Sequence, residues 1–172
     1  MITGASSGIG LATARMAAAR GARLVLAARN KEALETLTHE IRQRGGDAYY
    51  VVADVGVESD VREIARIAQE RFGGFDAWIN NAATAIYGKL LDIKSEDLRR
   101  LFETNFWSVV YGSLITARHL RQRGGPIIHL GSTFSDRAIP IQGMYSASKF
   151  AVKGFTDALG IDLQKDELLV SA

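Results

Sequence analysis

Short apolar runs alternate with longer amphipathic segments along the whole chain. Runs of the kind that form buried strands lie at Arg23–Ala28, Ala48–Val52, Ala77–Asn80 and Pro126–Leu130. Between them, apolar residues recur at helical spacing, which predicts helices over Gly10–Arg20, Lys31–Arg44 and Ser59–Phe72. Strands that alternate with helices in this way are typical of βαβ units built around a parallel sheet.

Residues that begin, end or interrupt helices refine this pattern. Gly21, Gly45 and Gly73 follow the three predicted helices and are placed to end them, and Ser59 is expected to cap the third.

Two longer segments complete the predicted elements. Ser95–Arg123 is too long for one ordinary helix and predicts two helices, bent near Asn105, while Tyr145–Gln164 is the last long helix. Right-handed crossovers would bring ligands to the carboxyl ends of the strands, where the loops carry the unusual residues.

The composition narrows the possible functions. With 172 residues and 47% apolar side chains, the chain can bury the core of one domain. The 21 Lys and Arg exceed the 19 Asp and Glu by only two and are interspersed with them, so no nucleic-acid surface is expected. The chain has no cysteine and no apolar span of membrane length, so we expect no disulfide, no membrane partner and a cytoplasmic location.

A glycine-rich loop follows the first apolar residues and opens the first helix. It reads Thr3-Gly4-Ala5-Ser6-Ser7-Gly8-Ile9-Gly10. Gly4 would allow the tight turn, Gly8 would let the backbone approach a pyrophosphate, and Gly10 would let the helix pack against the sheet. With the free N–H groups of the helix N-terminus, Gly4, Ser6, Ser7, Gly8, Ile9 and Gly10 are candidates for binding the phosphates of a cofactor. A plain structural turn is the alternative.

The end of the second strand bears on the choice of cofactor. A carboxylate there would bind the ribose hydroxyls of NAD, but the chain reads Ala28-Arg29-Asn30. Guanidinium binds phosphate oxygens through paired hydrogen bonds, so Arg29 and Asn30 favour NADP(H), with NAD(H) as the second candidate. Asp54, followed by Val55, is a candidate to accept a hydrogen bond from adenine; capping the next helix is its alternative.

The last long helix carries the candidate catalytic pair. Tyr145 and Lys149 are four residues apart and so share one helix face. A cation one turn away favours the phenolate, which suits a group that exchanges protons with a carbonyl or alcohol oxygen. Ser132 follows the strand Pro126–Leu130, so its hydroxyl could meet the same substrate oxygen.

Taken in order, these residues resemble the short-chain dehydrogenase/reductase family. The matching residues are Thr3-Gly4-x-x-x-Gly8-x-Gly10, Asp54-Val55, Asn80-Asn81-Ala82, Asn105, Ser132 and Tyr145-x-x-x-Lys149, which cover nearly the whole chain. The resemblance implies a Rossmann-type, doubly wound parallel sheet with helices on both faces, in a single domain over residues 1–172.

The resemblance also implies a role for each candidate. Tyr145 would be the catalytic acid and base, and Ser132 would stabilise the substrate oxygen. Lys149 would bind the nicotinamide ribose and tune Tyr145, and Asn105 would hold a water in the proton relay. Tyr145 and Lys149 would thus also contact the cofactor.

The chain departs from the family pattern in three places. Asn81 and Ala82 would line the adenosine side of the cofactor, but Ala83 replaces the family's glycine, and its methyl would crowd the packing there. The apolar start runs directly into the glycine loop, and Leu168–Ala172 reads as a strand that stops as it begins. We therefore expect truncation at both ends, with an incomplete first strand and no substrate-covering segment.

The remaining residues concern substrate and metal. Phe134 and Gln142 flank Ser132 and Tyr145 and are candidates for contact with a small-molecule carbonyl or alcohol, although a loop packing on itself would explain them as well. His39, His119 and His129 are far apart and lack ligand spacing, so no metal site is expected.

The helix Phe106–Arg123 bears on assembly. It places Val109, Val110, Ser113, Leu114 and Ala117 at helical spacing. The family resemblance implies that this helix and the last one form a subunit bundle in a homodimer or homotetramer; burial within the chain is the alternative.

The sequence as a whole predicts reversible hydride transfer between NADP(H) and a ketone or secondary alcohol. A protein that binds the cofactor without catalysis is the alternative function.

Overall fold

The computed structural model describes residues 1–121, 123–164 and 168–171. Its strands are β1 (Ile2–Thr3), β2 (Leu24–Ala28), β3 (Ala48–Val52), β4 (Trp78–Asn80), β5 (Gly125–His129) and β6 (Leu168–Ser171). Its α-helices are α1 (Gly8–Ala18), α2 (Lys31–Gln43), α3 (Glu58–Phe72), α4 (Ser95–Phe102), α5 (Ser108–Leu120) and α6 (Gly143–Asp162). Two 3₁₀ segments, η1 (Leu90–Asp92) and η3 (Thr133–Ser135), and the π-helical η2 (Glu103–Trp107) join them.

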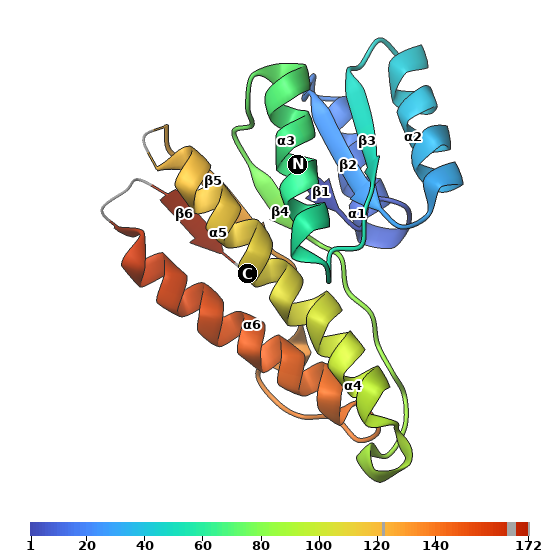
Figure 1. Cartoon of the computed structure of the whole chain (residues 1–172), viewed down its shortest axis with the longest axis vertical. Helices are drawn as coiled ribbons and strands as arrows, with labels where there is room; N and C mark the ends of the chain where they lie inside the picture. Colours follow the sequence, from blue (N-terminus) through green and yellow to red (C-terminus); the bar gives the residue numbers. More distant parts are fainter. Residues whose placement is uncertain (122, 165–167, 172) are drawn as a thin grey trace.

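The strands form one parallel sheet in the order β3-β2-β1-β4-β5-β6 (Figure 1). This is the doubly wound parallel sheet that the sequence predicts. The strand order reverses between β1 and β4, and loops leaving the carboxyl ends of neighbouring strands diverge at such a point. Ligands of open α/β sheets bind there.

Helices cover both faces of the sheet, and each face has its own apolar core. Along β2, Val25 and Ala27 pack with residues of α3, while Leu24, Leu26 and Ala28 pack with residues of α1 and α2. A strand buried on both faces reads as a continuous apolar run, which explains the sequence pattern of β2.

The predicted helix ends are mostly confirmed. Gly21, Gly45 and Gly73 all have positive φ, which a residue without a Cβ adopts at no steric cost. The prediction that Ser59 caps the third helix is wrong, because α3 begins one residue earlier. The N-cap position is Val57, which makes no side-chain cap, and the Asp60 carboxylate accepts a hydrogen bond from the Asp54 N–H in the turn before the helix.

The long segment after β4 divides into two helices as predicted. α4 and α5 are separated by the π-helical turn η2, which contains Asn105. Single π-helical turns within helices are frequent at functional sites. Residue 122, near the predicted end of this segment, and residue 172, at the predicted end of the last strand, lie outside the described residues. No helix in the described part of the chain is long and apolar enough to cross a membrane.

Candidate active site

The glycine loop between β1 and α1 is shaped by steric contacts at two of its glycines. Gly4 has φ +66°, and a Cβ there would lie 2.7 Å from the Asn81 amide nitrogen. At Gly10 a Cβ would lie 2.3 Å from the Gly4 carbonyl oxygen. Gly10 thus lets the start of α1 lie close against the residues that directly follow β1 and β4.

Gly8 differs from these two glycines. It has φ +54°, yet a Cβ at this position would meet no atom within 4 Å. The positive φ explains the glycine, and the open space above it leaves the backbone accessible. This agrees with the prediction that Gly8 lets the backbone approach a phosphate group.

Asn81 holds the glycine loop in place. Its amide donates hydrogen bonds to the backbone oxygens of Thr3 and Gly4, at 2.9 and 3.2 Å. The backbone N–H groups of Asn81 and Ala82 both donate to the Thr3 hydroxyl, at 3.1 and 3.2 Å. Both amide protons of Asn81 are thus used within the protein, so the side chain supports the loop. Thr3 was missed at the sequence level, although a polar residue at the end of a buried strand was a usable signal.

A cleft of about 400 Å³ opens where the strand order reverses. We call it the glycine-loop cleft. It is lined by eleven of the predicted cofactor residues, namely Gly4, Ser6, Ser7, Gly8, Ile9, Arg29, Asn30, Asp54, Val55, Asn81 and Ala82, and by Ala28, Ala53, Ala83 and Thr104. Gly10, Tyr145 and Lys149 do not line it. The structure therefore brings the residues of separate sequence motifs together around one concave site.

Arg29 and Asn30 lie at one wall of this cleft. Asn30 caps α2, because its side-chain oxygen accepts a hydrogen bond from the Ala33 N–H at 3.0 Å. Arg29 is exposed and has no ion pair with any of the described residues. Its guanidinium is therefore free to bind an anion in the cleft.

Asp54, at another wall, is held by a residue that the sequence did not single out. One carboxylate oxygen accepts a hydrogen bond from the Gly56 N–H at 3.0 Å, and the other pairs with Arg100 of α4. A Cβ at Gly56 would lie 2.6 Å from the Arg100 guanidinium. Arg100 thus packs over this turn and fixes the carboxylate at the rim of the cleft.

Tyr145 and Lys149 lie on the first turns of α6, which begins two residues before the predicted start. Lys149 is 4% exposed, and its ammonium donates a hydrogen bond to the Leu130 carbonyl oxygen at 2.6 Å. Burial lowers the pKa of this ammonium. The same nitrogen lies 5.8 Å from the centre of the Tyr145 ring, so the predicted pairing of the two residues is present.

Tyr145 faces a small hollow of about 310 Å³, which we call the tyrosine hollow. Its lining consists of Ala83, Thr84, Ala85, Tyr87, Phe134, Gln142 and Tyr145. The structure therefore brings both predicted substrate residues together with Tyr145. The rings of Phe134 and Tyr145 meet edge to face, with centres 5.6 Å apart.

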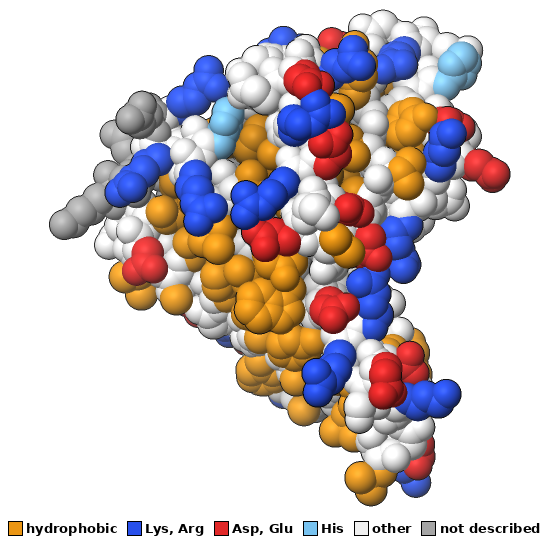
Figure 2. All heavy atoms as spheres, viewed as in Figure 1, with side chains coloured by type: hydrophobic (Ala, Val, Ile, Leu, Met, Phe, Trp, Pro, Cys, Tyr) orange, Lys and Arg blue, Asp and Glu red, His pale blue; other side chains and the backbone are white. Residues whose placement is uncertain are grey.

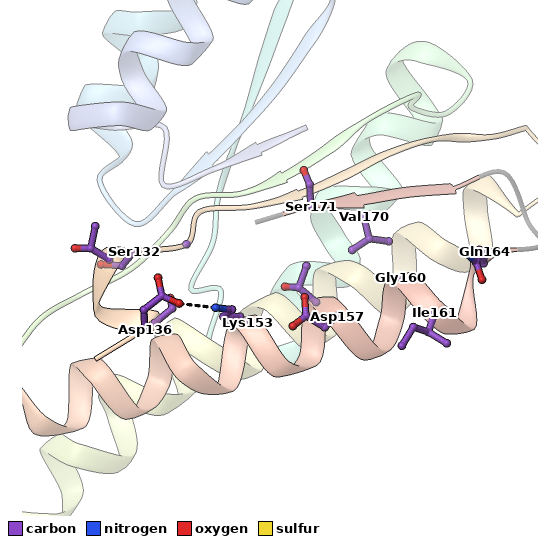
Figure 3. Close-up of a pocket in the computed structure, with 13 residues that line it drawn as sticks. Ser132, Asp136, Lys153, Asp157, Gly160, Ile161, Gln164, Val170 and Ser171 are labelled. Carbon is purple, nitrogen blue, oxygen red and sulfur yellow. Dashed lines mark hydrogen bonds and ion pairs between the residues drawn. The ribbon is translucent and has the colours of Figure 1, made fainter. Parts of the chain in front are cut away.

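Ser132 lines a different hollow, of about 750 Å³, between the end of β5, α6 and β6 (Figure 3). Its oxygen accepts a hydrogen bond from the Phe134 N–H at 3.2 Å and so caps η3. Because the oxygen acts as acceptor in this contact, the serine proton remains available for another partner.

Asn105 is buried, and its side chain joins three segments. Its amide oxygen accepts from the Thr84 N–H and its nitrogen donates to the Thr84 carbonyl oxygen, both at 2.8 Å. The nitrogen also donates to the Ser148 hydroxyl at 3.1 Å, and Ser148 donates to the Tyr145 carbonyl oxygen at 2.7 Å. Asn105 thus fixes one wall of the tyrosine hollow to the catalytic helix, a function that the sequence did not reveal.

Two backbone positions near the site differ from expectation. Ala83 is exposed and is not among the described residues with positive φ, so its backbone is not in the left-handed region that favours glycine. Ile141, just before α6, is the one described non-glycine residue with positive φ, at 59°. A β-branched residue in this region is strained, and no feature of the sequence predicts it.

The fold and the site together define a class of protein. A glycine-rich turn between the central strand and the first helix, with a cleft at the reversal of strand order, is the architecture of Rossmann-type dinucleotide-binding domains. The family model described as short chain dehydrogenase matches residues 1–172, and the chain belongs to this family.

Individual relatives agree with this assignment. The chain is 50% identical to the "uncharacterized oxidoreductase YxnA" of Bacillus subtilis over 173 residues, which are 99% of this chain and 49% of that protein. It is 34% identical to versicolorin reductase stcU of Emericella nidulans, over 100% of this chain and 66% of the relative. The chain thus spans about half of the first relative and about two thirds of the second.

Solved structures agree as well. An alcohol dehydrogenase from Thermococcus sibiricus complexed with 5-hydroxy-NADP superposes with a TM-score of 0.90 at 33% identity, over 94% of this chain and 69% of that one. A short chain dehydrogenase/reductase from Burkholderia phymatum in complex with NAD gives 0.95 at 32% identity, over 99% and 62%. The neighbours therefore include binders of either nicotinamide cofactor.

Proposed function

We propose that the protein transfers hydride reversibly between NADP(H) and the carbon of a ketone or secondary alcohol. The observation that carries this proposal is the place of Ala83, which lines both the glycine-loop cleft and the tyrosine hollow. The two spaces therefore adjoin. A dinucleotide bound along the first would end beside a substrate held in the second.

The residues of the glycine-loop cleft fit a dinucleotide. Open space above Gly8 and the N-terminus of α1 suit a pyrophosphate, and Asp54 at the rim suits the adenosine end. When a dinucleotide is bound along this cleft, its nicotinamide would supply or accept the hydride. The unpaired Arg29 supports NADP(H) over NAD(H), because the extra ribose phosphate of NADP would find a guanidinium partner.

The chain's own residues handle the proton. Tyr145 would donate to the carbonyl oxygen during reduction and accept from the alcohol during oxidation. Lys149, one turn further along the same helix, would bind the nicotinamide ribose beside Tyr145. Ser132 lines a different hollow from Tyr145, so its free proton would stabilise the substrate oxygen only for a substrate that reaches from the tyrosine hollow to the end of β5.

The proposed proton relay includes a water at Asn105. Both amide protons of Asn105 are donated to other residues, Thr84 and Ser148. The water would therefore have to donate to the side-chain or backbone oxygen of Asn105.

The protein is proposed to act in the cytoplasm as a homodimer or homotetramer. Of the residues predicted to face a partner, Val109, Ser113 and Ala117 are buried within the chain itself. Trp107 and Leu114, by contrast, are exposed on this helical segment, and Figure 2 shows apolar side chains gathered over it. An exposed apolar stripe of this kind is suited to burial against a second copy.

A carbonyl panel with NADPH and with NADH tests the proposal. We expect NADPH consumption to match alcohol formation for some ketones, and a weaker response with NADH. Arg29→Ala should weaken NADPH binding by one to two orders of magnitude, on the scale of charge-assisted hydrogen bonds, and leave NADH binding nearly unchanged. Equal losses for both cofactors would contradict the cofactor assignment, and absence of turnover across the panel would contradict the activity.

A further inference from the structure

A buried chain of polar side chains crosses the protein beneath the candidate active site. Its members are Trp78 and Asn80 of β4, Ser113 of α5, His129 of β5 and Thr156 of α6. None of them is more than 5% exposed. Buried polar groups are costly unless they are hydrogen-bonded, so the direction of each bond is constrained.

The hydrogen bonds fix the tautomer of His129. The Thr156 hydroxyl donates to the Val152 carbonyl oxygen at 2.7 Å, so it can only accept from His129 Nδ1, also at 2.7 Å. Nδ1 therefore carries the ring proton and Nε2 is an acceptor. The Ser113 hydroxyl, 2.8 Å from Nε2, must then be the donor in that contact.

The other end of the chain is consistent with this assignment. Asn80 Nδ2 donates to the Ser113 oxygen at 3.5 Å, and the Trp78 indole N–H donates to Asn80 Oδ1 at 2.8 Å. Every donor from the indole to the Val152 carbonyl has an acceptor when His129 is neutral. Burial first, and then the charge of Lys149, lower the pKa of His129 and so favour the neutral ring.

The network has a mechanical consequence for the catalytic helix. α6 is joined to β5 by polar contacts at two points, since Lys149 donates to the Leu130 carbonyl oxygen and Thr156 accepts from His129. Leu130 directly follows His129, and Lys149 and Thr156 are two turns apart on one helix face. Two such contacts fix both the translation and the rotation of α6 along the strand.

We propose that His129 is a positioning residue, whose neutral imidazole sets the place of α6 on β5 and thereby that of Tyr145 and Lys149. The same ring holds Ser113 of α5, the helix that continues from the π-helical turn of Asn105. This inference rests on the proposed function for its kinetic consequence. The effect of the Thr156 contact on the surroundings of Lys149 does not depend on that function.

Removal of the Thr156 hydroxyl tests the inference. Thr156→Val keeps the side-chain size but deletes the acceptor, whereas Thr156→Ser retains it. Thr116→Val is the matched control, because the Thr116 hydroxyl is also buried and, among the described residues, bonds within its own helix to the Gly112 carbonyl oxygen. We expect Thr156→Val to lower kcat about tenfold with KM for NADPH within about twofold, since a shift below 1 Å suffices for such a loss. Thr156→Ser should restore kcat, and Thr116→Val should not change it.

A nuclear magnetic resonance measurement of the Lys149 ammonium adds a readout that needs no turnover. We expect its signal and its pKa to move in Thr156→Val but not in Thr116→Val, with folding of each variant checked by circular dichroism. A wild-type kcat and an unmoved Lys149 signal in folded Thr156→Val would overturn the inference and leave the proposed function intact. If no carbonyl is reduced, the proposed function fails, and the Lys149 signal alone decides whether the positioning holds.

Discussion

Acid should destabilise the protein through His129. Burial first, and then the charge of Lys149, lower the pKa of His129 from the usual 6.5 to about 4. At pH values between these two, the unfolded chain binds a proton at His129 and the folded protein does not. Unfolding therefore takes up a proton in this range, and the free energy of unfolding falls as the pH falls.

The size of the effect follows from the shift in pKa. Between pH 6.5 and pH 4, each pH unit lowers the free energy of unfolding by about 1.4 kcal/mol. His129 alone should therefore lower it by about 3 kcal/mol over this range. Above pH 6.5 the imidazole is neutral in both states and contributes no pH dependence. Below pH 4 the folded state is protonated too, and the loss ends.

Urea denaturation at a series of pH values, with His129→Asn as reference, isolates this contribution. Asparagine does not titrate, and its amide can still donate toward Thr156. At pH 7 the variant should be less stable than the wild type by about 1–2 kcal/mol, the scale of a lost buried hydrogen bond. That difference should vanish about one pH unit below 6.5 and should be reversed by about 1–2 kcal/mol at pH 4. A difference that stays constant over this window would refute the neutral, buried imidazole and the hydrogen-bond directions deduced from it.

Three further variants test other parts of the structure. In thermal melts, Gly10→Ala should lower the free energy of unfolding by about 2–3 kcal/mol, because its methyl would lie 2.3 Å from a loop carbonyl oxygen, and it should weaken cofactor binding. The control Gly160→Ala should be neutral or stabilising, because its methyl meets nothing closer than 4.0 Å. Arg100→Ala should raise the NADPH dissociation constant several-fold in a fluorescence titration, through release of Asp54, and an unchanged constant would speak against that link. Trp107→Glu should lower the mass measured by light scattering to that of a monomer, because this side chain is 45% exposed on the apolar stripe. An unchanged mass would show that the subunit interface does not include Trp107.

Most of the fold could be predicted from the sequence because local signals determine it. The buried strands of a parallel sheet read as apolar runs, as in Leu24–Ala28, and glycines with positive φ end the helices after them. That the candidate cofactor residues lie around one cleft could be predicted as well. Gly8 and Arg29 lie at the carboxyl ends of neighbouring strands, and topology alone brings such loops together.

The supporting contacts could not be predicted, because they join residues that are distant in sequence. The clamp of Asn81 on Thr3 spans 78 residues, and the bond from Asn105 to Ser148 spans 43. Asparagine and serine carry no directional signal in a sequence, so nothing indicated that these side chains would face one another. The Ser59 cap failed because α3 begins at Glu58, so that Ser59 lies inside the first turn and Val57 takes the cap position.

The central claim is that Tyr145 exchanges the proton while the cofactor is bound next to it. The most direct measurement compares wild type and Tyr145→Phe for deuterium transfer from deuterated NADPH to a ketone substrate, together with NADPH affinity. We predict that the variant binds NADPH as tightly as the wild type within a few-fold, yet transfers deuterium at least about a hundredfold more slowly, on the scale of general acid catalysis. Transfer at the wild-type rate in Tyr145→Phe would contradict the account.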